Sequence, residues 1–325
     1  MTRPPLSLLD LTRVREDQGP AQALKNAAAI AAHVETLGFH RYWVAEHHNM
    51  VGVASAATPV VVAHVGAATS RIRIGSGGVM LPNHAPYVVA EQYGTLAQLF
   101  PGRIDLGLGR APGTDGATLI RALRRDPQGA DRFPQDVVEL MGWFAPENAL
   151  GITAVPAAGT DVQFVILGSS HFGALLAAEL GLPFGFASHF APAALLDALY
   201  LYRSNFKPSA RLREPHAIVA ANVVCAETEA EARYLFTTMQ QGFLGLVRNN
   251  RRYQMPPGPL DWNAREEAQV MAMLGCHAVG TPDQVRAGLE AIVAQTQADE
   301  VIVVTDTHDF EARKRSLSLT AKAWF

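Results

Sequence analysis

Short apolar segments with the length of β-strands alternate with longer segments of helical periodicity along almost the whole chain. The eight predicted strands are Leu6–Leu11, Tyr42–Ala45, Arg71–Met80, Ile104–Gly109, Phe164–Leu167, Gly185–Ser188, Ile218–Val224 and Glu300–Thr305. A helical segment follows each of them, and eight strand–helix pairs are the number that closes a (β/α)8 barrel. No linker divides the chain, so we predict an α/β fold, a single (β/α)8 TIM barrel over residues 1–325.

Two long insertions interrupt this alternation. Ala111–Thr160 follows the fourth strand, and Gly242–Leu274 follows the seventh helix. Segments of this length without secondary structure are usually functional covers or disordered in a compact domain. Because the active site of such a barrel lies at the carboxyl ends of its strands, we predict that Ala111–Thr160 is a lid. We expect Met255, Trp143 and Phe190 to line the pocket.

Charge and composition disfavour several classes of protein. The 27 Lys and Arg residues nearly balance the 30 Asp and Glu residues and form no basic stripe, so we expect no nucleic-acid partner. No apolar run reaches membrane-spanning length, and the first residues do not follow the plan of a signal peptide. Cys225 and Cys276 have no metal-ligand spacing. We therefore expect a soluble, cytoplasmic protein without membrane contact.

Adjacent glycines interrupt the third predicted strand, in the run Gly75-Ser76-Gly77-Gly78. Glycine weakens a strand, and it commonly marks a bulge or the close approach of a ligand. Gly77 and Gly78 therefore have two interpretations that the residues alone leave equal. One is a bulge that helps to close the barrel, and the other is a flat backbone surface for a planar ring.

Glu46-His47-His48 follows the second strand directly, at the rim where catalytic residues of this fold gather. A histidine there can exchange a proton near neutral pH. The alternative, which is common for histidines after a strand, is a structural pair that bonds to the backbone. No partner carboxylates or histidines are evident at other strand ends, so we predict no metal site.

An anion site is predicted at the ends of the fourth and fifth strands. Arg110 ends the fourth strand and Arg132 lies in the insertion, and either guanidinium could bind a phosphate. Gly168, Ser169 and Ser170 open the next helix, where free amide groups and the helix dipole favour an anion. Surface ion pairs and an ordinary serine cap are the alternatives.

In combination, these motifs resemble the bacterial luciferase-like flavin-dependent monooxygenase family, over nearly the whole chain. The resemblance is sharpest in four segments, which occur in order and with barrel spacing. They are Gly38-Phe39 through His47-His48, Gly75–Pro86, Gly102–Arg110 and Val279-Gly280-Thr281-Pro282.

The resemblance implies a role for each candidate residue. His47 matches the catalytic histidine beside the flavin, and we place Glu46 with it in the catalytic set. Gly77-Gly78 matches a non-prolyl cis peptide beneath the isoalloxazine ring. Arg110 and Ser170 match residues that hold the flavin phosphate, with Arg132 as a second arginine, and we place Gly168 and Ser169 with them in the cofactor site.

The resemblance also implies a monooxygenase that uses reduced FMN and O2 through a C4a-(hydro)peroxyflavin to oxygenate a small organic substrate. It implies a homodimer, with FMN reduced by a separate NAD(P)H:flavin reductase. Gly109 and Gly173 replace a cysteine and a threonine of the light-emitting luciferase, which disfavours bioluminescence. The alternatives are a reductase of the same fold that uses F420 or a flavin, and a flavin-binding protein without turnover.

Overall fold

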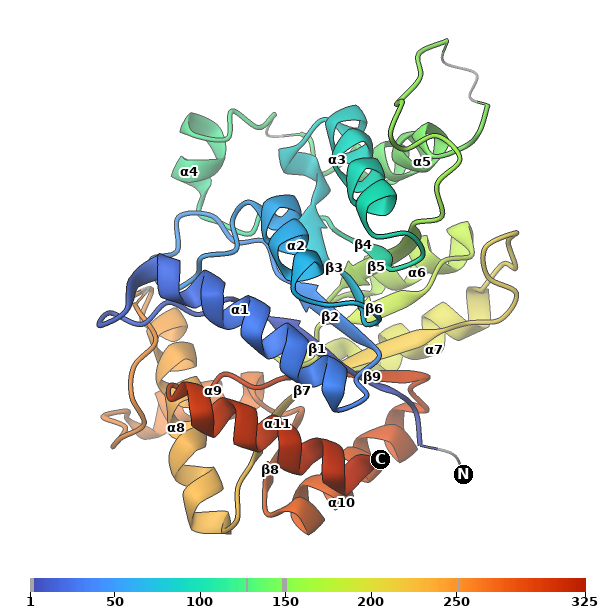
Figure 1. Ribbon diagram of the computed structural model, residues 1–325. Coiled ribbons are helices and arrows are strands. Elements are labelled where there is room, and N and C mark those ends of the chain that lie inside the picture. The colour runs from blue at the N-terminus through green and yellow to red at the C-terminus, as the bar shows by residue number, and fades with distance from the viewer. Residues whose placement is uncertain (1–2, 127, 148–150, 251) are drawn as a thin grey trace.

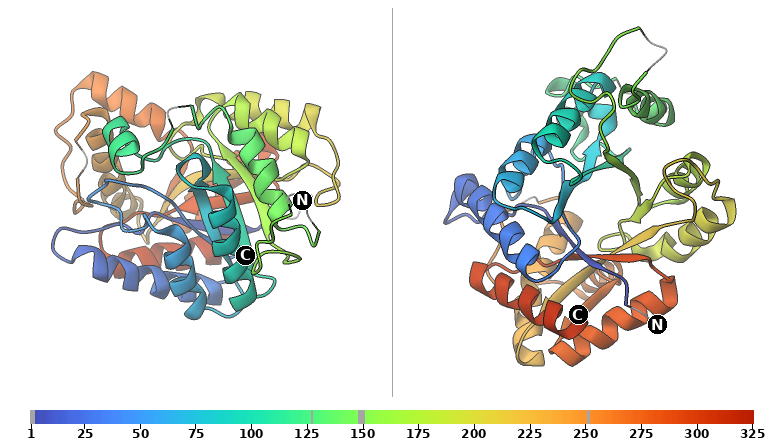
Figure 2. Two further views of the ribbon diagram at one scale, coloured as in Figure 1. Left: turned by 90° about the horizontal axis from the view of Figure 1, so that it is seen from above. Right: turned by 45° about the vertical axis from the view of Figure 1, so that its right-hand side comes forward.

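The computed structural model describes residues 3–126, 128–147, 151–250 and 252–325, and in it a ring of parallel strands is surrounded by helices (Figures 1 and 2). The strands are β1 (Leu6–Asp10), β2 (Arg41–Val44), β3 (Arg73–Met80), β4 (Ile104–Gly109), β5 (Gln163–Gly168), β6 (Phe184–Phe186), β7 (Ala217–Cys225), β8 (His277–Gly280) and β9 (Glu300–Val304). They pair in the order β6-β5-β4-β3-β2-β1-β9-β7-β8, and β6 also pairs with β7. That last pairing closes an eight-stranded barrel, so the predicted (β/α)8 fold is confirmed.

Strand β8 was not predicted, and it lies outside the barrel ring. The last residues of β7, Asn222–Cys225, pair with His277–Gly280. The preceding part of β7 pairs with β9 and β6. A single long strand therefore belongs to the barrel along its first part and carries an additional edge strand along its last part.

Helices cover the outside of the sheet, as expected for parallel strands joined by crossovers. The α-helices are α1 (Gly19–Thr36), α2 (Thr58–Ala67), α3 (Pro86–Leu99), α4 (Gly116–Arg121), α5 (Phe133–Trp143), α6 (His171–Leu180), α7 (Leu195–Asn205), α8 (Glu229–Val247), α9 (Ala264–Met273), α10 (Pro282–Thr296) and α11 (Phe310–Trp324). Two short 3-10 turns, η1 (Leu81–Asn83) and η2 (Pro192–Ala194), complete the set. None of these helices is both long enough and apolar enough to cross a membrane.

The insertion Ala111–Thr160 is more regular than the predicted lid. It contains α4 and α5, and α5 buries Phe133, Val137, Leu140 and Trp143. Helix α5 packs beside α3 (Figure 1) and takes the place of a barrel helix after β4. Helix α5 of this insertion is thus part of the outer layer of the barrel, because its apolar residues follow helical spacing and are buried.

The second insertion, Gly242–Leu274, contains the end of α8 and the whole of α9. Asn263 begins α9 with a capping box, in which its side chain accepts from the backbone of Glu266 and the Glu266 side chain accepts from the Asn263 backbone. The irregular part is therefore confined to the segment between Val247 and Asn263.

Buried ionic groups occupy the opposite end of the barrel from the strand carboxyl ends. Arg41, the first residue of β2, lies 2.9 Å from Asp105 and 2.8 Å from Glu300. Asp105 also binds Arg73 at 2.6 Å, and Ser7 donates to Glu300. These groups start their strands, so they fill the barrel interior at the amino ends.

The two ends of the described chain lie side by side. The Arg3 guanidinium donates to the Trp324 carbonyl at 2.9 Å, and the Trp324 indole donates to the Pro4 carbonyl at 2.8 Å. The residues before β1 are thus held against the end of α11.

Candidate active site

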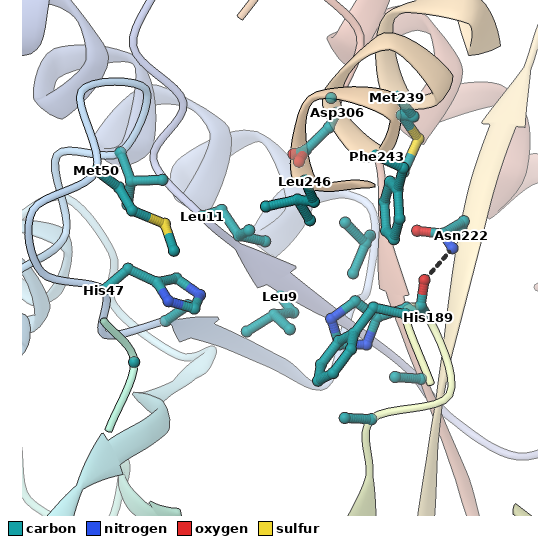
Figure 3. A pocket seen from close by; sticks show the side chains of 18 of the residues that line it. Leu9, Leu11, His47, Met50, His189, Asn222, Met239, Phe243, Leu246 and Asp306 are labelled. Atoms are coloured by element: carbon teal, nitrogen blue, oxygen red, sulfur yellow. Dashed lines mark hydrogen bonds between the residues drawn. The ribbon is translucent and has the colours of Figure 1, made fainter. Parts of the chain in front are cut away.

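A cavity of about 560 Å³ opens at the carboxyl ends of the barrel strands (Figure 3). Residues from the ends of every barrel strand line it, together with residues of α8 and of the segment that follows α8. Most of these side chains are apolar, and Leu9, Leu11, Met239, Phe243 and Leu246 are among them (Figure 3). The location is the one where (β/α)8 enzymes carry their active sites.

His47 reaches this cavity just beyond the end of β2. Its Nδ1 atom is buried and has no hydrogen-bond partner among the described residues. Burial is the main cause that lowers the pKa of His47 to about 4, and the charge of Arg13 lowers it further. The ring is therefore neutral near pH 7, so one nitrogen carries a proton while the other can accept one.

Glu46 faces away from the cavity that His47 lines. Its Oε1 atom lies 2.7 Å from His48 Nε2 and 2.8 Å from His84 Nε2, and its Oε2 atom accepts from the Met80 backbone at 3.1 Å. Burial alone would raise its pKa, but the hydrogen bonds from His48, His84 and Met80 lower the pKa to about 2. The structure does not bring Glu46 to the cavity with His47; Glu46 joins the end of β2 to the end of β3 as a positioning residue.

His84, from the turn after η1, joins Glu46 and His48 in one cluster, and the sequence analysis did not predict it. One ligand atom from each of Glu46, His48 and His84 lies within 4.8 Å of the other two. In the observed arrangement both histidine Nε2 atoms bond to one carboxylate oxygen, so the cluster satisfies its own hydrogen bonds.

Gly77 and Gly78 form one wall of the cavity, and the peptide bond between them is cis, as the family resemblance implied. The pairing of β3 with β4 also shifts register between Ser76 and Val79, so the irregular strand and the backbone wall occur together. A Cβ atom on Gly77 would lie 2.8 Å from Leu9 Cδ1, and one on Gly78 would lie 2.6 Å from the carbonyl oxygen of Gly107. The backbone of Gly107 thus requires glycine at position 78, whereas a side chain at position 77 would have to displace Leu9 and Trp43.

Arg110, Gly168, Ser169 and Ser170 meet at another side of the cavity, and all four line it. Ser170 precedes α6, and its side chain caps none of the helix amide groups. The Arg110 guanidinium lies 4.0 Å from the centre of the Phe172 ring and has no carboxylate partner among the described residues. A cation, two hydroxyl groups and uncapped helix amides fit the phosphate of a flavin nucleotide.

Arg132 is not part of this corner. It precedes α5, pairs with Asp126 at 3.1 Å, and its side chain is 63% exposed. It does not line the cavity. The structure therefore does not bring it to the other phosphate candidates, because α5 holds its start on the outer surface.

His189 and Asn222 are cavity residues that the sequence analysis missed. The Asn222 side chain donates to the His189 carbonyl at 2.6 Å, and the Asn222 Oδ1 and His189 Nδ1 atoms have no partner among the described residues (Figure 3). Burial is the main cause that lowers the pKa of His189 to about 3. A polar residue in the buried strand β7 and a histidine just after β6 were the available signals.

The segment between α8 and α9 covers the cavity in place of the predicted lid. Met255, Pro259 and Leu260 of this segment line the cavity, whereas the insertion after β4 contributes little beyond its first residues and Phe133. Phe190 lines the cavity as expected. Trp143 does not, because its ring packs edge-on against Tyr87 at 5.1 Å in the outer layer.

Comparison with known proteins assigns this architecture to a family. Residues 5–300 match the family model of the luciferase-like monooxygenases. A protein of Escherichia coli K12 named luciferase-like monooxygenase is 49% identical over 320 residues, which cover 96% of this chain and 95% of that protein. An N-acetyl-S-alkylcysteine monooxygenase of Bacillus subtilis is 35% identical over 187 residues, 56% of each protein.

Solved structures share the fold over nearly their whole length. Apo-MsnO8 has a TM-score of 0.89 and 31% identity, and the match covers 99% of this chain and 98% of that one. The oxygenating constituent of 3,6-diketocamphane monooxygenase from Pseudomonas putida, solved with FMN, has a TM-score of 0.72 at 17% identity and coverages of 98% and 97%. An F420-dependent secondary alcohol dehydrogenase has a TM-score of 0.70 at 15% identity, with complete coverage of both chains.

Proposed function

The chain belongs to the luciferase-like monooxygenase family, and we propose that it binds reduced FMN and uses O2 to oxygenate a small organic substrate. The observation that carries this proposal is the arrangement of three features around one apolar cavity. They are the neutral His47 ring, the backbone wall of Gly77 and Gly78, and the anion corner of Arg110, Ser169 and Ser170.

The proposed cofactor site uses residues of neighbouring strands. Arg110, Ser169, Ser170 and the first amides of α6 would hold the phosphate, and the backbone at Gly77-Gly78 would face the ring system. Bound flavin supplies the activation of O2 for oxygen transfer, and the protein supplies position, a proton and a dry cavity.

His47 is the proposed acid/base residue of this reaction. Its pKa of about 4 keeps the ring uncharged at neutral pH, so it can give a proton at one nitrogen and accept one at the other. The apolar lining and the segment after α8 exclude water from the same space. Glu46 acts indirectly. Its carboxylate bonds to His48 and to the Met80 amide, and it thereby holds the chain next to His47 against the end of β3.

Three further proposals rest on the family resemblance. A separate NAD(P)H:flavin reductase supplies the reduced FMN, the protein acts as a homodimer, and it works in the cytoplasm. We propose aldehydes and ketones as substrates to test, and the name of the Bacillus subtilis relative adds thioethers to them.

In the first test, reduced or oxidised FMN is titrated into the protein under anaerobic conditions, and fluorescence reports the binding. Oxygen uptake is then measured with NADH, a flavin reductase and a panel of aldehydes, ketones and thioethers. We expect stoichiometric binding of reduced FMN and substrate-dependent oxygen uptake. Absence of flavin binding contradicts the proposal. Oxidation of reduced F420 without oxygen uptake favours the reductase alternative, and FMN binding without any turnover favours a flavin-binding protein.

A further inference from the structure

We propose that Arg13 is a substrate-binding residue and that the substrate is an apolar molecule bearing a carboxylate. This inference rests on the proposed function, because it names the substrate class of the same cavity. It starts from a cation in the cavity wall, in the loop after β1, whereas the proposed phosphate corner lies at the ends of β4 and β5.

The backbone around Arg13 is fixed on both sides. Thr12 turns the chain after β1 with a positive φ of 49°, and its amide donates to the Asp10 carboxylate at 2.7 Å. Arg13 then forms an antiparallel bridge with Val53, supported by the bond from the Val14 amide to the Gly52 carbonyl. The side chain therefore leaves a constrained loop and enters the cavity wall.

The guanidinium of Arg13 is oriented by one carboxylate. Its Nε atom donates to Asp306 Oδ2 at 2.7 Å, and Asp306 is 4% exposed against 29% for Arg13. Behind Asp306, Arg313 lies 3.9 Å from its other oxygen and 3.1 Å from Asp10. A row of alternating charges thus runs from the core to the cavity, and Arg13 is its last member.

The two terminal nitrogens of Arg13 remain available. Neither forms a hydrogen bond with any residue in the described part of the chain, since Nε alone has a bonded partner there. Asp306 Oδ2 bonds the Nε atom of Arg13, and its other oxygen lies 3.9 Å from Arg313. A planar guanidinium held at Nε presents its two remaining amino groups as a fork, and this geometry suits a carboxylate.

The surroundings favour an anion at Arg13 rather than at Arg248, which also lines the cavity. His47 and His189 are both neutral near pH 7, and the Arg13 charge helps to lower the pKa of each. Arg248 donates from Nε and from both terminal nitrogens to Asp261 and Glu266, so it presents no free fork. Of these two arginines, Arg13 is therefore the one that can offer its terminal nitrogens to an anionic substrate in the cavity.

The remainder of the cavity fits an apolar body joined to that carboxylate. Leu9 and Leu11 lie between His47 and His189, and Phe243 and Leu246 close the side toward α8 (Figure 3). An amphipathic acid would place its charged end on Arg13 and bury its chain among these residues, where burial of apolar surface adds affinity.

The test is isothermal titration of hexanoate, octanoate and decanoate, each beside its uncharged amide, into the full-length protein with and without oxidised FMN. We expect at least one acid to bind 10-fold or more tightly than its amide, as removal of a charge-assisted hydrogen bond predicts. Arg13→Met is expected to abolish this preference, and Arg13→Lys to restore part of it, since the ammonium group keeps the charge without the fork.

Arg248→Met is the matched control, because Arg248 also lines the cavity but is already paired; the preference for the acid is expected to survive this change. Equal binding of acids and amides, or a preference that Arg13→Met leaves intact, overturns the proposal. Loss of the preference in Arg110→Met but not in Arg13→Met overturns it as well, because the acid then occupies the phosphate corner. If Arg13→Met fails to fold, Arg13→Lys is used instead. A preference for each acid over its amide that equals that of the wild type would then overturn the role of the fork. These measurements need no turnover, so they separate this inference from the proposed monooxygenase activity.

Discussion

Both ends of the barrel interior hold buried polar residues, but the two ends differ in how fully these residues have hydrogen-bond partners within the described part of the chain. At the amino ends of the strands, Arg41 binds two carboxylates, and Glu300 accepts from Arg41, Ser7 and His216. At the carboxyl ends, polar atoms of His47, His189, Asn222 and Asp306 have no hydrogen-bond partner among the described residues.

This difference separates stability from function within one fold. A buried polar group without a partner costs free energy, and a folded protein keeps such groups chiefly where a ligand or water completes them. The amino end is complete in the chain alone and serves the fold. The carboxyl end is incomplete in the chain alone, which is expected of a surface that binds a cofactor and a substrate.

Removing a charge from the ionic cluster at the amino ends of the strands should have the largest effect on the stability of the fold. Arg41→Met leaves Asp105 and Glu300 buried without their shared cation, so we expect the free energy of unfolding to fall by about 3–5 kcal/mol. Urea denaturation followed by circular dichroism measures it. Arg233→Met is the control, because the Arg233 pair with Glu229 on α8 is solvent-exposed and should be worth no more than about 1 kcal/mol. A loss in Arg41→Met as small as the control's would show that the ionic cluster is not needed for stability.

The same kind of change at the incomplete end should spare the fold and remove the activity. His47→Asn is expected to lower the rate of substrate-dependent oxygen uptake by about 10²–10⁴-fold, which is typical of the loss of an acid/base residue. Unfolding free energy and FMN affinity should stay close to wild type, because the His47 Nδ1 atom supports no other described residue. Turnover at the wild-type rate would remove His47 from the proposed mechanism.

The contrast between the ends also explains what the sequence could predict. Strand segments, the (β/α)8 fold and the glycine pair at Gly77-Gly78 follow from local pattern and family resemblance, and the structure confirms the fold and the cis bond. Short apolar runs and glycine positions carry this information locally, because backbone conformation and burial pattern are set over a few residues.

Long-range partners could not be read in the same way. His84 is 38 positions from Glu46, and Asp306 is 293 positions from Arg13, so only the closed barrel brings them together. The prediction that Arg132 lies with Arg110 was wrong for the opposite reason. The two residues belong to neighbouring segments of the sequence, but α5 keeps Arg132 on the surface. Helix α9 was not predicted, because Pro256, Pro257 and Pro259 just before it indicate an irregular segment.

A third change sharpens the contrast within the incomplete end itself. Arg110→Met removes the cation of the phosphate corner, so we expect FMN affinity to fall by about 10–100-fold, the range for a hydrogen bond to a charged group. Arg132→Met is the matched control and should leave the affinity unchanged, because Arg132 is exposed and paired with Asp126. Fluorescence titration of FMN measures both. Equal losses in the two variants would mean that net charge, and not the corner, governs binding.

The smallest effect, and the one that distinguishes the two ends without ligand, is the response to acid. The folded pKa values of His47 and His189, about 4 and about 3, lie below the ordinary value of 6.5. Between these limits the unfolded chain binds protons that the folded chain does not, so the free energy of unfolding falls as pH falls below about 6.5. From about pH 7 to about pH 5 we expect a loss of about 1–2 kcal/mol per histidine. The Glu300 pKa of about 2 means that the amino end loses free energy of unfolding only at lower pH, below about pH 4.5.

Urea denaturation across this pH range measures the free energy of unfolding, which should depend less steeply on pH in His47→Asn than in the wild type. His64→Asn, which removes an exposed histidine on α2, serves as the control. An unchanged slope in His47→Asn would mean that the cavity end is no more acid-sensitive than the rest of the fold.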